Sequence, residues 1–528
     1  MNTEPVYVAG QWRPSHASGT FQADNPATKN PLADVYPISS WADVDEALDA
    51  AVEAADALRN VPGEQIGLFL ELYAALIEAQ RAPLVAMAHA ETALPVRPRL
   101  AEVELPRTSG QLREAARAAR TGSWLLPTID TKLNIRSCHA PLGPVWVFGP
   151  NNFPFAFNSI AGGDFAAAIA TGNPVIAKAN TSHPGTTRLL ALAAAQAAHE
   201  AGLPKGTVQL LYRIGHEDGA RAVADARVGA TAYTGSRAAG LVLKAAADRA
   251  GKPIYLELSS VNPVVILPGA IQTRGEQIAG EFVTSCLMGT GQFCTNPGLV
   301  ILLEGAETEK FVAAVADKFR QAPVGTLLSS GVERTLAANL RKLVAGGAQI
   351  LVGETPAAGA GYSHANTLLR VGGAKFLADP ERFQTEAFGN ASLVVTARSN
   401  AEAAQIIDAL EGNLTGCFYA DAGGNDETLY SQLAPRLRRR VGRLLNDKMP
   451  TGVAVSSAMN HGGPFPATGH PGFTAVGIPA ALRRFTALEC YDNVPAHRLP
   501  AALANKNPTG TMWRLIDGNW SQADVTAA

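Results

Sequence analysis

The chain has 528 residues and a mass of 55.1 kDa, a length that predicts about three domains or one large two-lobed enzyme. Hydrophobic residues make up 47% and charged residues 17% of the chain, so it can bury sizeable cores and is not intrinsically disordered. The 44 Lys and Arg residues nearly balance the 46 Asp and Glu residues. This balance argues against a protein that coats nucleic acid or a membrane surface.

The N-terminal segment has no basic region followed by an apolar stretch, so no signal peptide is expected and the protein is predicted to be cytoplasmic. Segments 137–163 and 282–303 lack charge, but glycine and proline interrupt both. We therefore interpret them as buried strands and site loops rather than membrane-spanning helices. The five cysteines form no CxxC pair, so neither a zinc ribbon nor a disulfide framework is predicted, and no metal cluster is visible.

Apolar residues at helical spacing predict amphipathic helices at the start of the chain, over residues 41–60, 64–90 and 99–120. From residue 141 onward, short apolar runs alternate with Ala-rich stretches. We predict strands over 144–149, 173–178, 209–212, 230–233 and 254–258. Between them we predict helices over 155–171, 184–201, 218–224 and 236–250. This alternation is typical of a mostly parallel sheet with helices on both faces.

The alternation resumes after residue 262, which indicates a second α/β unit from about 260 to 460. Its predicted strands include 262–267 and 299–303, and its predicted helices include 274–288 and 307–319. The polar tail after about residue 505 is expected to pack loosely.

The most informative segment is Gly289-Thr-Gly-Gln-Phe-Cys294-Thr, a cysteine in a Gly-rich loop between a helix and a strand. Such a loop can expose the sulfur and offer backbone N–H groups that lower its pKa or bind an oxyanion. An arbitrary cysteine is more often a small buried hydrophobic residue, so this segment needs support from others. A second Gly-rich turn, Thr234 to Gly240, could place phosphate at a helix N-terminus but is weak evidence alone.

Support comes from polar residues at the ends of the predicted strands. Asn152 follows a strand in Gly149-Pro-Asn-Asn-Phe-Pro154, and Lys178 ends the run Val-Ile-Ala-Lys. Glu257 lies within an apolar strand, where a charge needs a partner or a task. Glu386-Ala-Phe388-Gly adds a further acidic and aromatic pair. Each feature alone has an ordinary structural explanation.

Together and in this order, these residues resemble the aldehyde dehydrogenase superfamily, from Tyr7-Val-Ala-Gly-Gln-Trp12 to about residue 500. The resemblance implies an α/β fold with two Rossmann-like parallel-sheet domains and a small β oligomerisation element. The implied cofactor-binding domain takes residues 1–125 and 145–258, and the catalytic domain takes 259–460. The oligomerisation element takes 126–144 and 480–505, and a homodimer or homotetramer is implied.

The resemblance also assigns roles to individual residues. Cys294 would attack the aldehyde carbon, Asn152 and the Cys294 backbone N–H would bind the oxyanion, and Glu257 would activate the water that hydrolyses the thioester. Members that use coenzyme A instead of water usually lack this Glu, so a free carboxylate is the expected product. The residues implied to bind the cofactor are Lys178, Thr181, Gly235, Ser236, Glu386 and Phe388.

Several positions depart from the commonest pattern of the superfamily, namely Asn151, Ser259-Ser260, Asn390 and Thr181. A Glu at the position of Thr181 would bind both ribose hydroxyls and repel a 2′-phosphate. Thr181 removes that charge, so NADP is admissible besides NAD. Arg213 could add charge nearby, but the sequence does not place it.

These departures are similar to one branch, the α-ketoglutarate semialdehyde (2,5-dioxopentanoate) dehydrogenases and their NADP-using fatty-aldehyde relatives. The segments that carry this resemblance are Glu91-Thr-Ala-Leu-Pro, Arg107-Thr-Ser-Gly-Gln-Leu-Arg113, Ser260-Val-Asn-Pro263, Pro450-Thr-Gly-Val453 and His461-Gly-Gly-Pro-Phe-Pro466. By analogy His461 would lie near the substrate mouth; alternatively it is a polar surface residue.

The resemblance therefore implies oxidation of 2,5-dioxopentanoate to 2-oxoglutarate with NADP or NAD, with no nucleic acid or membrane partner. The alternative is a broad-range or fatty aldehyde dehydrogenase that uses NADP. A catalytically inactive member that serves as a binding protein is disfavoured, because Cys294, Glu257, Asn152 and Lys178 are all present.

Overall fold

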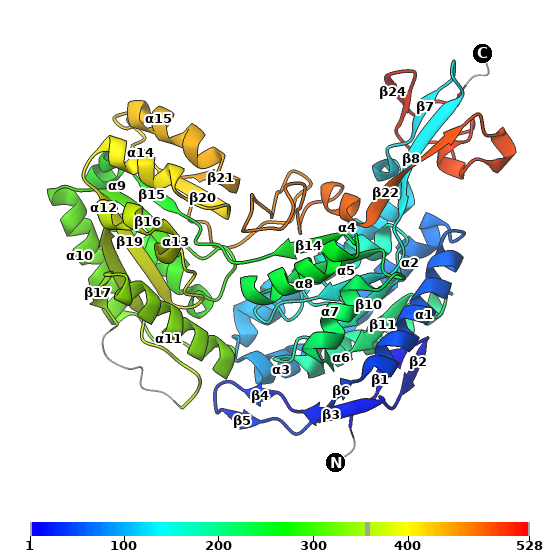
Figure 1. Cartoon of the computed structure of the whole chain (residues 1–528), viewed down its shortest axis with the longest axis horizontal. Helices are drawn as coiled ribbons and strands as arrows, with labels where there is room; N and C mark the ends of the chain where they lie inside the picture. Colours follow the sequence, from blue (N-terminus) through cyan, green and yellow to red (C-terminus); the bar gives the residue numbers. More distant parts are fainter. Residues whose placement is uncertain (1–2, 354–359, 526–528) are drawn as a thin grey trace.

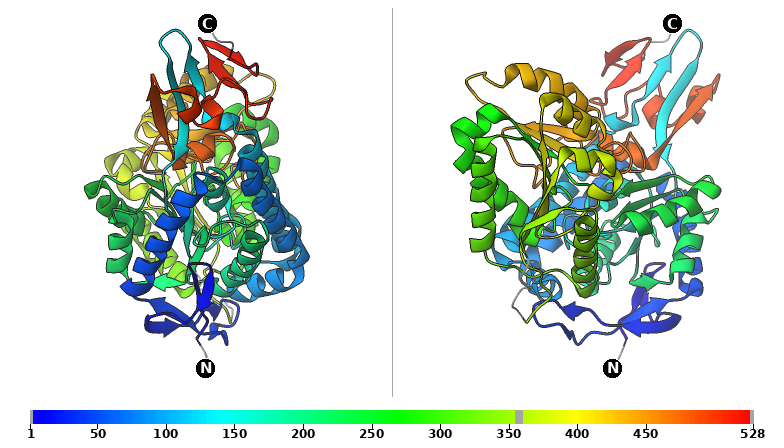
Figure 2. Two further views of the ribbon diagram at one scale, coloured as in Figure 1. Left: turned by 90° about the vertical axis from the view of Figure 1, so that its right-hand side faces the viewer. Right: turned by 60° about the vertical axis from the view of Figure 1, so that its left-hand side comes forward.

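The computed structural model describes residues 3–353 and 360–525. Two α/β lobes lie side by side, and a β-arm projects from the first lobe at the end where the C-terminus lies (Figure 1). The projecting arm is visible in two further views, and the right-hand one also shows the two lobes (Figure 2). The segment between β21 (Val441–Asn446) and the 3-10 helix η4 (Ala480–Phe485) crosses from the second lobe to the first, so residues near 450–478 lie where the lobes meet.

Helices α1–α4 precede the first parallel strands. Their bounds are Trp41–Leu58 for α1, Gly63–Ala79 for α2, Arg81–Thr92 for α3 and Leu105–Thr121 for α4, with a π-helical segment over Val96–Glu104. The single helix predicted over 64–90 is thus wrong, because the chain changes direction at Gln80 and α3 begins there with Pro83 in its first turn. The helix predicted over 41–60 is confirmed within two residues as α1, and the helix predicted over 99–120 begins within the π-helical segment and continues through α4.

The first lobe contains a seven-stranded sheet in the order β14-β13-β9-β10-β11-β1-β2. The strands β1 (Val6–Val8) and β2 (Gln11–Arg13) form its antiparallel edge. The strands that form its parallel part are β9 (Val145–Phe148), β10 (Val175–Lys178), β11 (Val208–Leu211), β13 (Ala230–Thr234) and β14 (Ile254–Glu257). The helices around them are α5 (Gly163–Ala170), α6 (Pro184–Glu200), α7 (His216–Ala224) and α8 (Arg237–Arg249). The strands are almost completely buried, as expected for a sheet covered on both faces.

The strand order of this sheet decides where ligands can bind. From β9 the chain adds β10 and β11 on one side and then β13 and β14 on the other, which is the Rossmann-like arrangement. A crevice opens where the order reverses, beyond the carboxyl ends of β9 and β13. Asn152 follows β9, Lys178 ends β10, Gly235 follows β13 and Glu257 ends β14, so all four lie at this edge of the sheet.

The second lobe repeats the same arrangement. Its seven-stranded sheet has the order β17-β18-β19-β16-β15-β20-β21, with only β17 antiparallel. The strands are β15 (Val264–Ile266), β16 (Leu299–Leu303), β17 (Gln349–Val352), β18 (Thr367–Gly372), β19 (Ala391–Ala397), β20 (Asn413–Tyr419) and β21 (Val441–Asn446). The longer covering helices are α9 (Pro268–Leu287), α10 (Ala306–Gln321), α11 (Ser330–Ala345), α14 (Asn400–Asp408) and α15 (Glu427–Arg438).

The projecting arm is a five-stranded sheet in the order β22-β8-β7-β23-β24. Its strands are β7 (Thr128–Asp130), β8 (Ile135–Pro141), β22 (Thr486–Asp492), β23 (Arg514–Ile516) and β24 (Asn519–Ser521). The expectation of a loosely packed tail after residue 505 is wrong. β23 pairs with β7, and the buried guanidinium of Arg514 donates hydrogen bonds to the carbonyls of Ala504, Asn505 and Ala523.

The helix predicted over 155–171 begins only at Gly163. Residues 155–162 form turns instead, because the Glu104 carboxylate accepts hydrogen bonds from the backbone N–H groups of Phe155 and Ala156. This segment connects Asn152 to α5, so the turns help to place Asn152 in the crevice. Among the described residues, no helix combines the length and apolarity that crossing a bilayer requires.

Candidate active site

Cys294 lies in a loop between α9 and β16 that glycine makes possible. Gly289, Thr290 and Gly291 all have positive φ, and a Cβ at Gly291 would lie 2.0 Å from the carbonyl oxygen of Gly389. The Asn262 side chain donates to the carbonyl oxygens of Cys294 and Asn296, at 2.9 Å each. The loop is therefore braced from outside, and the half-buried sulfur has a defined position.

Glu257 ends β14 and is almost completely buried. One carboxylate oxygen, Oε1, lies 3.0 Å from Nε2 of His461, and the carboxylate also forms a hydrogen bond with the Cys294 thiol. The other oxygen, Oε2, is buried and has no hydrogen-bond partner within the part of the chain that the structure describes. An unpartnered buried carboxylate oxygen is costly, and here it is available to accept a proton from water or thiol.

His461 is not a surface residue. Its ring is buried, and its Nε2 lies 3.5 Å from Sγ of Cys294 as well as close to Glu257. The backbone N–H of His461 donates to Oγ1 of Thr474, and its ring packs at 5.8 Å from the ring of Phe157. The surface interpretation is thus wrong, because tertiary contacts bring this Gly/Pro-rich loop against the thiol.

The pKa of the Cys294 thiol is raised well above its usual range, mainly by burial and also by the neighbouring Glu257 carboxylate. The positive charge of Arg107 acts in the opposite direction but does not compensate. Of the two effects that the Gly-rich loop could have, a lowered pKa of the sulfur and binding of an oxyanion, the direction of this shift agrees only with the second. Ionisation of the thiol requires an acceptor for its proton, which Glu257 can provide.

Asn152 lies in the loop after β9, and its side-chain amide donates to the carbonyl oxygen of Gln292 at 3.0 Å. An amide nitrogen carries two N–H groups, so one is left for an oxyanion. Gln292 is itself fixed, since its Oε1 accepts from the backbone N–H of Leu328 at 2.8 Å. These bonds place Asn152 beside the Cys294 loop.

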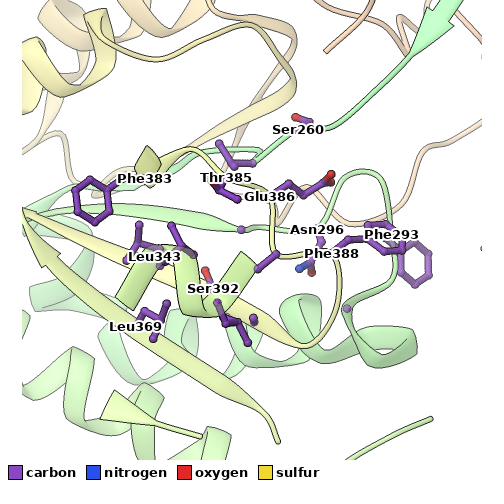
Figure 3. Close-up of a pocket in the computed structure, with 17 residues that line it drawn as sticks. Ser260, Phe293, Asn296, Leu343, Leu369, Phe383, Thr385, Glu386, Phe388 and Ser392 are labelled. Carbon is purple, nitrogen blue, oxygen red and sulfur yellow. The ribbon is translucent and has the colours of Figure 1, made fainter. Parts of the chain in front are cut away.

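Glu386 and Phe388 line a pocket on the other side of that loop, together with Ser260, Phe293 and Asn296. Figure 3 shows Phe388, Phe293 and Asn296 at one end of the pocket and Phe383 at the other, with Glu386 between them. Burial raises the pKa of Glu386 to about 7, although hydrogen bonds with Ser259 and the Ser260 backbone oppose this. The pocket thus joins an acidic group and an aromatic wall close to the nucleophile.

Lys178 ends β10, and Arg213 lies two residues after the neighbouring strand β11, close enough for its charge to act on Lys178. Burial lowers the pKa of Lys178 to about 8, and the charge of Arg213 contributes. Neither cation forms an ion pair with a carboxylate among the described residues, whereas Thr181 lies close along the chain and is half-buried. Two unneutralised cations at a ligand crevice are the environment that a phosphate prefers.

The turn after β13 can hold a second anionic group. Gly235 begins this turn, Ser236 caps the N-terminus of α8, and the buried hydroxyl of Thr234 has no hydrogen-bond partner within the described chain. A Cβ at Gly235 would lie 2.7 Å from the hydroxyl of Tyr233. The helix N-terminus, the orphaned hydroxyl and the cations together fit a dinucleotide with a phosphate-bearing ribose.

The cluster of Glu257, Cys294 and His461 also has the donor set of a metal site. One ligand atom each from Glu257, Cys294 and His461 lies within 4.8 Å of the others. Thiolate, imidazole and carboxylate are ligands that zinc accepts. The sequence contains no contiguous metal motif here, because the three residues come from distant segments.

Sequence reasoning gave no role in this site to Asn262 or Arg107, and it left the position of His461 open between the substrate mouth and the protein surface. Asn262 braces the nucleophile loop, His461 contacts the thiol, and Arg107 contributes charge to it. Arg107 and His461 stand in segments that resemble the branch, but nothing in their spacing predicts contact with Cys294. Only the packing of α4 and the 450–478 segment against the crevice brings them together.

Comparison with known proteins agrees with this geometry. Residues 12–463 match the model of the aldehyde dehydrogenase family. The chain is 41% identical to alpha-ketoglutaric semialdehyde dehydrogenase 2 of Azospirillum brasilense, over 95% of this chain and 96% of that protein. It is 34% identical to alpha-ketoglutaric semialdehyde dehydrogenase of Acinetobacter baylyi, over 99% of each chain.

Solved structures with lower identity share the fold. Lactaldehyde dehydrogenase of Escherichia coli superposes with a TM-score of 0.80 at 22% identity, covering 93% of this chain and 98% of that one. The 1-pyrroline-5-carboxylate dehydrogenase of Thermus, solved with bound NAD, has a TM-score of 0.80 at 24% identity, covering 93% and 92%. The architecture of two lobes and a β-arm is therefore shared beyond the semialdehyde enzymes.

Proposed function

Because the chain belongs to the aldehyde dehydrogenase family, we propose that it oxidises 2,5-dioxopentanoate to 2-oxoglutarate with NAD(P). The observation that carries this proposal is the cluster of Cys294, Glu257 and His461 at the carboxyl edge of a Rossmann-like sheet. Identity of 41% and 34% to two semialdehyde dehydrogenases over nearly the whole chain supports the substrate.

The reaction begins with transfer of the thiol proton from Cys294 to the carboxylate of Glu257, its hydrogen-bond partner. The Nε2–H group of His461 can then donate to the thiolate, which stabilises the charge in a buried position. The thiolate attacks the aldehyde carbon and forms a thiohemiacetal. Its oxyanion accepts hydrogen bonds from the free N–H of Asn152 and from the Cys294 backbone N–H.

A bound nicotinamide would supply the hydride acceptor for the oxidation of the thiohemiacetal to a thioester. Glu257 first releases the thiol proton to solvent and, again a carboxylate, takes a proton from water. The resulting hydroxide attacks the thioester carbon, and the carbon–sulfur bond breaks. The carboxylate product leaves, and the sulfur regains a proton. Lys178, Thr181, Gly235 and Ser236 would hold the adenosine end of the cofactor, and Glu386 and Phe388 the nicotinamide end.

The absence of an acid at residue 181 and the nearby cations Lys178 and Arg213 favour NADP as the better cofactor. The 2′-phosphate would lie beside these two cations. NAD lacks that phosphate, so the charges of Lys178 and Arg213 do not increase its affinity.

A homodimer or homotetramer completes the proposal. Strand β22 is an edge of the β-arm, and its outward residues Leu488 and Cys490 are exposed. An exposed edge strand offers unpaired backbone groups to a second copy. A neighbouring subunit would cover this edge.

The substrate assignment is tested by initial rates of NADPH formation with 2,5-dioxopentanoate and with hexanal at the same concentration. We expect a clear preference for the dioxo acid. The aromatic cluster of Phe153, Phe157, Phe293 and Phe473 beside the site favours a second candidate, a broad-range or fatty aldehyde dehydrogenase. A preference for hexanal would establish that candidate instead.

A further inference from the structure

Arg107 projects from α4 toward the catalytic cluster. Its guanidinium carbon lies 5.3 Å from the centre of the Phe157 ring, and the same ring lies 5.8 Å from that of His461. The charge of Arg107 acts on both Cys294 and Glu257. Phe157 is therefore bordered by Arg107 on one side and by the catalytic cluster on the other.

The guanidinium is fixed by two hydrogen bonds, and one edge is left free. Nε donates to Oε1 of Gln111 at 2.9 Å, and Nη1 donates to the carbonyl oxygen of Val453 at 2.7 Å. Nη2 is buried and has no partner among residues 3–353 and 360–525. A buried N–H group without a partner is costly, which indicates a ligand that supplies an acceptor.

No carboxylate within the described chain forms an ion pair with Arg107. Glu104 lies close enough to influence it, but its carboxylate is bound by Arg99 and by two backbone N–H groups. Arg443 is a second cation whose charge acts on Cys294. Among the residues that the structure describes, it donates to the carbonyl oxygens of Pro450 and Gly452 and toward the sulfur of Met459, and to no carboxylate. The mouth of the site thus holds positive charge that the protein itself does not neutralise.

We propose that Arg107 binds the distal carboxylate of the aldehyde substrate, with Nη2 donating to one of its oxygens. The inference rests on the proposed function and deepens it, because it names the residue that selects an aldehyde with a carboxylate. The carbon chain of 2,5-dioxopentanoate spans roughly 5 Å from the aldehyde to the carboxylate carbon. With its aldehyde at Cys294, the chain extends along Phe157 and places its carboxylate at Arg107.

This anchor makes selectivity depend on charge rather than on length. A hydrogen bond to a charged group is worth about 1.5–3 kcal/mol, which converts to roughly 10- to 150-fold in kcat/KM. A neutral aldehyde of the same length cannot form the bond and leaves the guanidinium edge unpaired. We expect the carboxylate preference of the enzyme to fall by this factor when Nη2 is removed.

The test measures kcat/KM of the full-length enzyme and of Arg107→Gln with 2,5-dioxopentanoate, 5-oxopentanoate and pentanal. Gln retains a donor for the Val453 carbonyl but lacks the second nitrogen. We expect roughly 10- to 150-fold loss with both carboxylate substrates, mainly through KM, and a change of less than about threefold with pentanal. Arg107→Lys, which keeps the charge, should recover part of the loss.

Arg113→Gln is the matched control, since Arg113 lies on the same helix and pairs through both Nη atoms with Glu78. It removes the same charge and should retain the substrate ratio of the wild type. An equal loss of Arg107→Gln with all three substrates would overturn the anchor, because it would show that Arg107 only supports the Val453 segment. An unchanged ratio would overturn it as well.

The two proposals can fail separately. If the wild type prefers the dioxo acid but Arg107→Gln retains this preference, the anchor is wrong and the proposed function stands. If the wild type oxidises 5-oxopentanoate as well as the dioxo acid, and Arg107→Gln loses both, the anchor stands and the 2-oxo group is not recognised.

Discussion

His461 and Cys294 are separated by 167 residues in the chain, and Nε2 of His461 lies 3.5 Å from Sγ of Cys294. The same nitrogen lies 3.0 Å from the Glu257 carboxylate. Because burial and Glu257 raise the pKa of the thiol, a nearby N–H donor is needed to stabilise the thiolate once it forms.

Replacing His461 with Ala should therefore lower kcat/KM roughly 10- to 100-fold, since a hydrogen bond to a charged group is lost. The deficit should shrink as the pH rises, because more of the thiol ionises without help. His461→Gln, which can present an N–H at a similar position, should retain more activity than His461→Ala.

His470 is a suitable control, because it belongs to the same segment but is exposed. His470→Ala should leave the pH–rate profile of the wild type unchanged. If His461→Ala has a profile parallel to that of the wild type at every pH, the proposed role of His461 in stabilising the thiolate is wrong.

The pKa of Lys178, lowered to about 8, predicts a pH dependence of cofactor binding. Lys178 carries its charge below pH 8 and loses it above, so its attraction for the 2′-phosphate weakens as the pH rises. The KM for NADP should increase several-fold between pH 7 and pH 9, and the KM for NAD should change less. Lys178→Met should remove the pH dependence; a flat KM for NADP in the wild type would argue against a contact with the phosphate.

Thr181→Glu should reverse the cofactor preference. A carboxylate at this position repels the 2′-phosphate and can accept from both ribose hydroxyls. We expect the ratio of kcat/KM for NADP over NAD to fall at least tenfold, measured with saturating aldehyde. Thr181→Ser, which keeps the hydroxyl, should retain the original ratio, and an unaffected ratio in Thr181→Glu would place the ribose elsewhere.

Zinc should inhibit the enzyme by binding the catalytic cluster. Glu257, Cys294 and His461 offer one carboxylate, one thiolate and one imidazole ligand within 4.8 Å. Inhibition by added Zn²⁺ should be reversed by EDTA and should require at least tenfold more metal in His461→Ala. Cys490→Ala is the control, because it removes an exposed thiol of the β-arm and should leave the sensitivity to zinc unchanged. If His461→Ala and the wild type are inhibited by the same concentration of zinc, zinc acts at another position.

Much of the fold could be predicted, because the strands of a parallel sheet are buried on both faces and therefore appear in the sequence as short apolar runs. The strands at Val145, Val175, Val208, Ala230 and Ile254 were all predicted within two residues, and the helix α6 likewise. Two predictions failed where tertiary hydrogen bonds outweighed local pattern. The Glu104 carboxylate accepts a hydrogen bond from the backbone N–H of Phe155 and stabilises a turn there. The Arg514 side chain donates to a backbone carbonyl oxygen and holds the polar tail in the β-arm.

The site was predictable to the extent that its residues follow strands. Asn152, Lys178 and Glu257 stand at strand ends, where parallel topology gathers side chains at one edge. His461 and Arg107 could not be placed, because neither a loop of glycine and proline nor an amphipathic helix indicates which crevice it will cover. The raised pKa of Cys294 was also missed, since it depends on burial and on Glu257, both properties of the assembled site.

The central claim is that Cys294 carries the acyl group and that Glu257 releases it. The most direct measurement is rapid mixing of Glu257→Gln with NADP and 2,5-dioxopentanoate, followed by acid quench and mass spectrometry of the digested protein. We expect slowed turnover, with a 2-oxoglutaryl adduct on the peptide that contains Cys294 and none in Cys294→Ala. The adduct should form more slowly than in the wild type, because Gln cannot accept the thiol proton, and it should persist, because Gln cannot activate water. Full steady-state turnover in Glu257→Gln, or an adduct on any other cysteine, would contradict it.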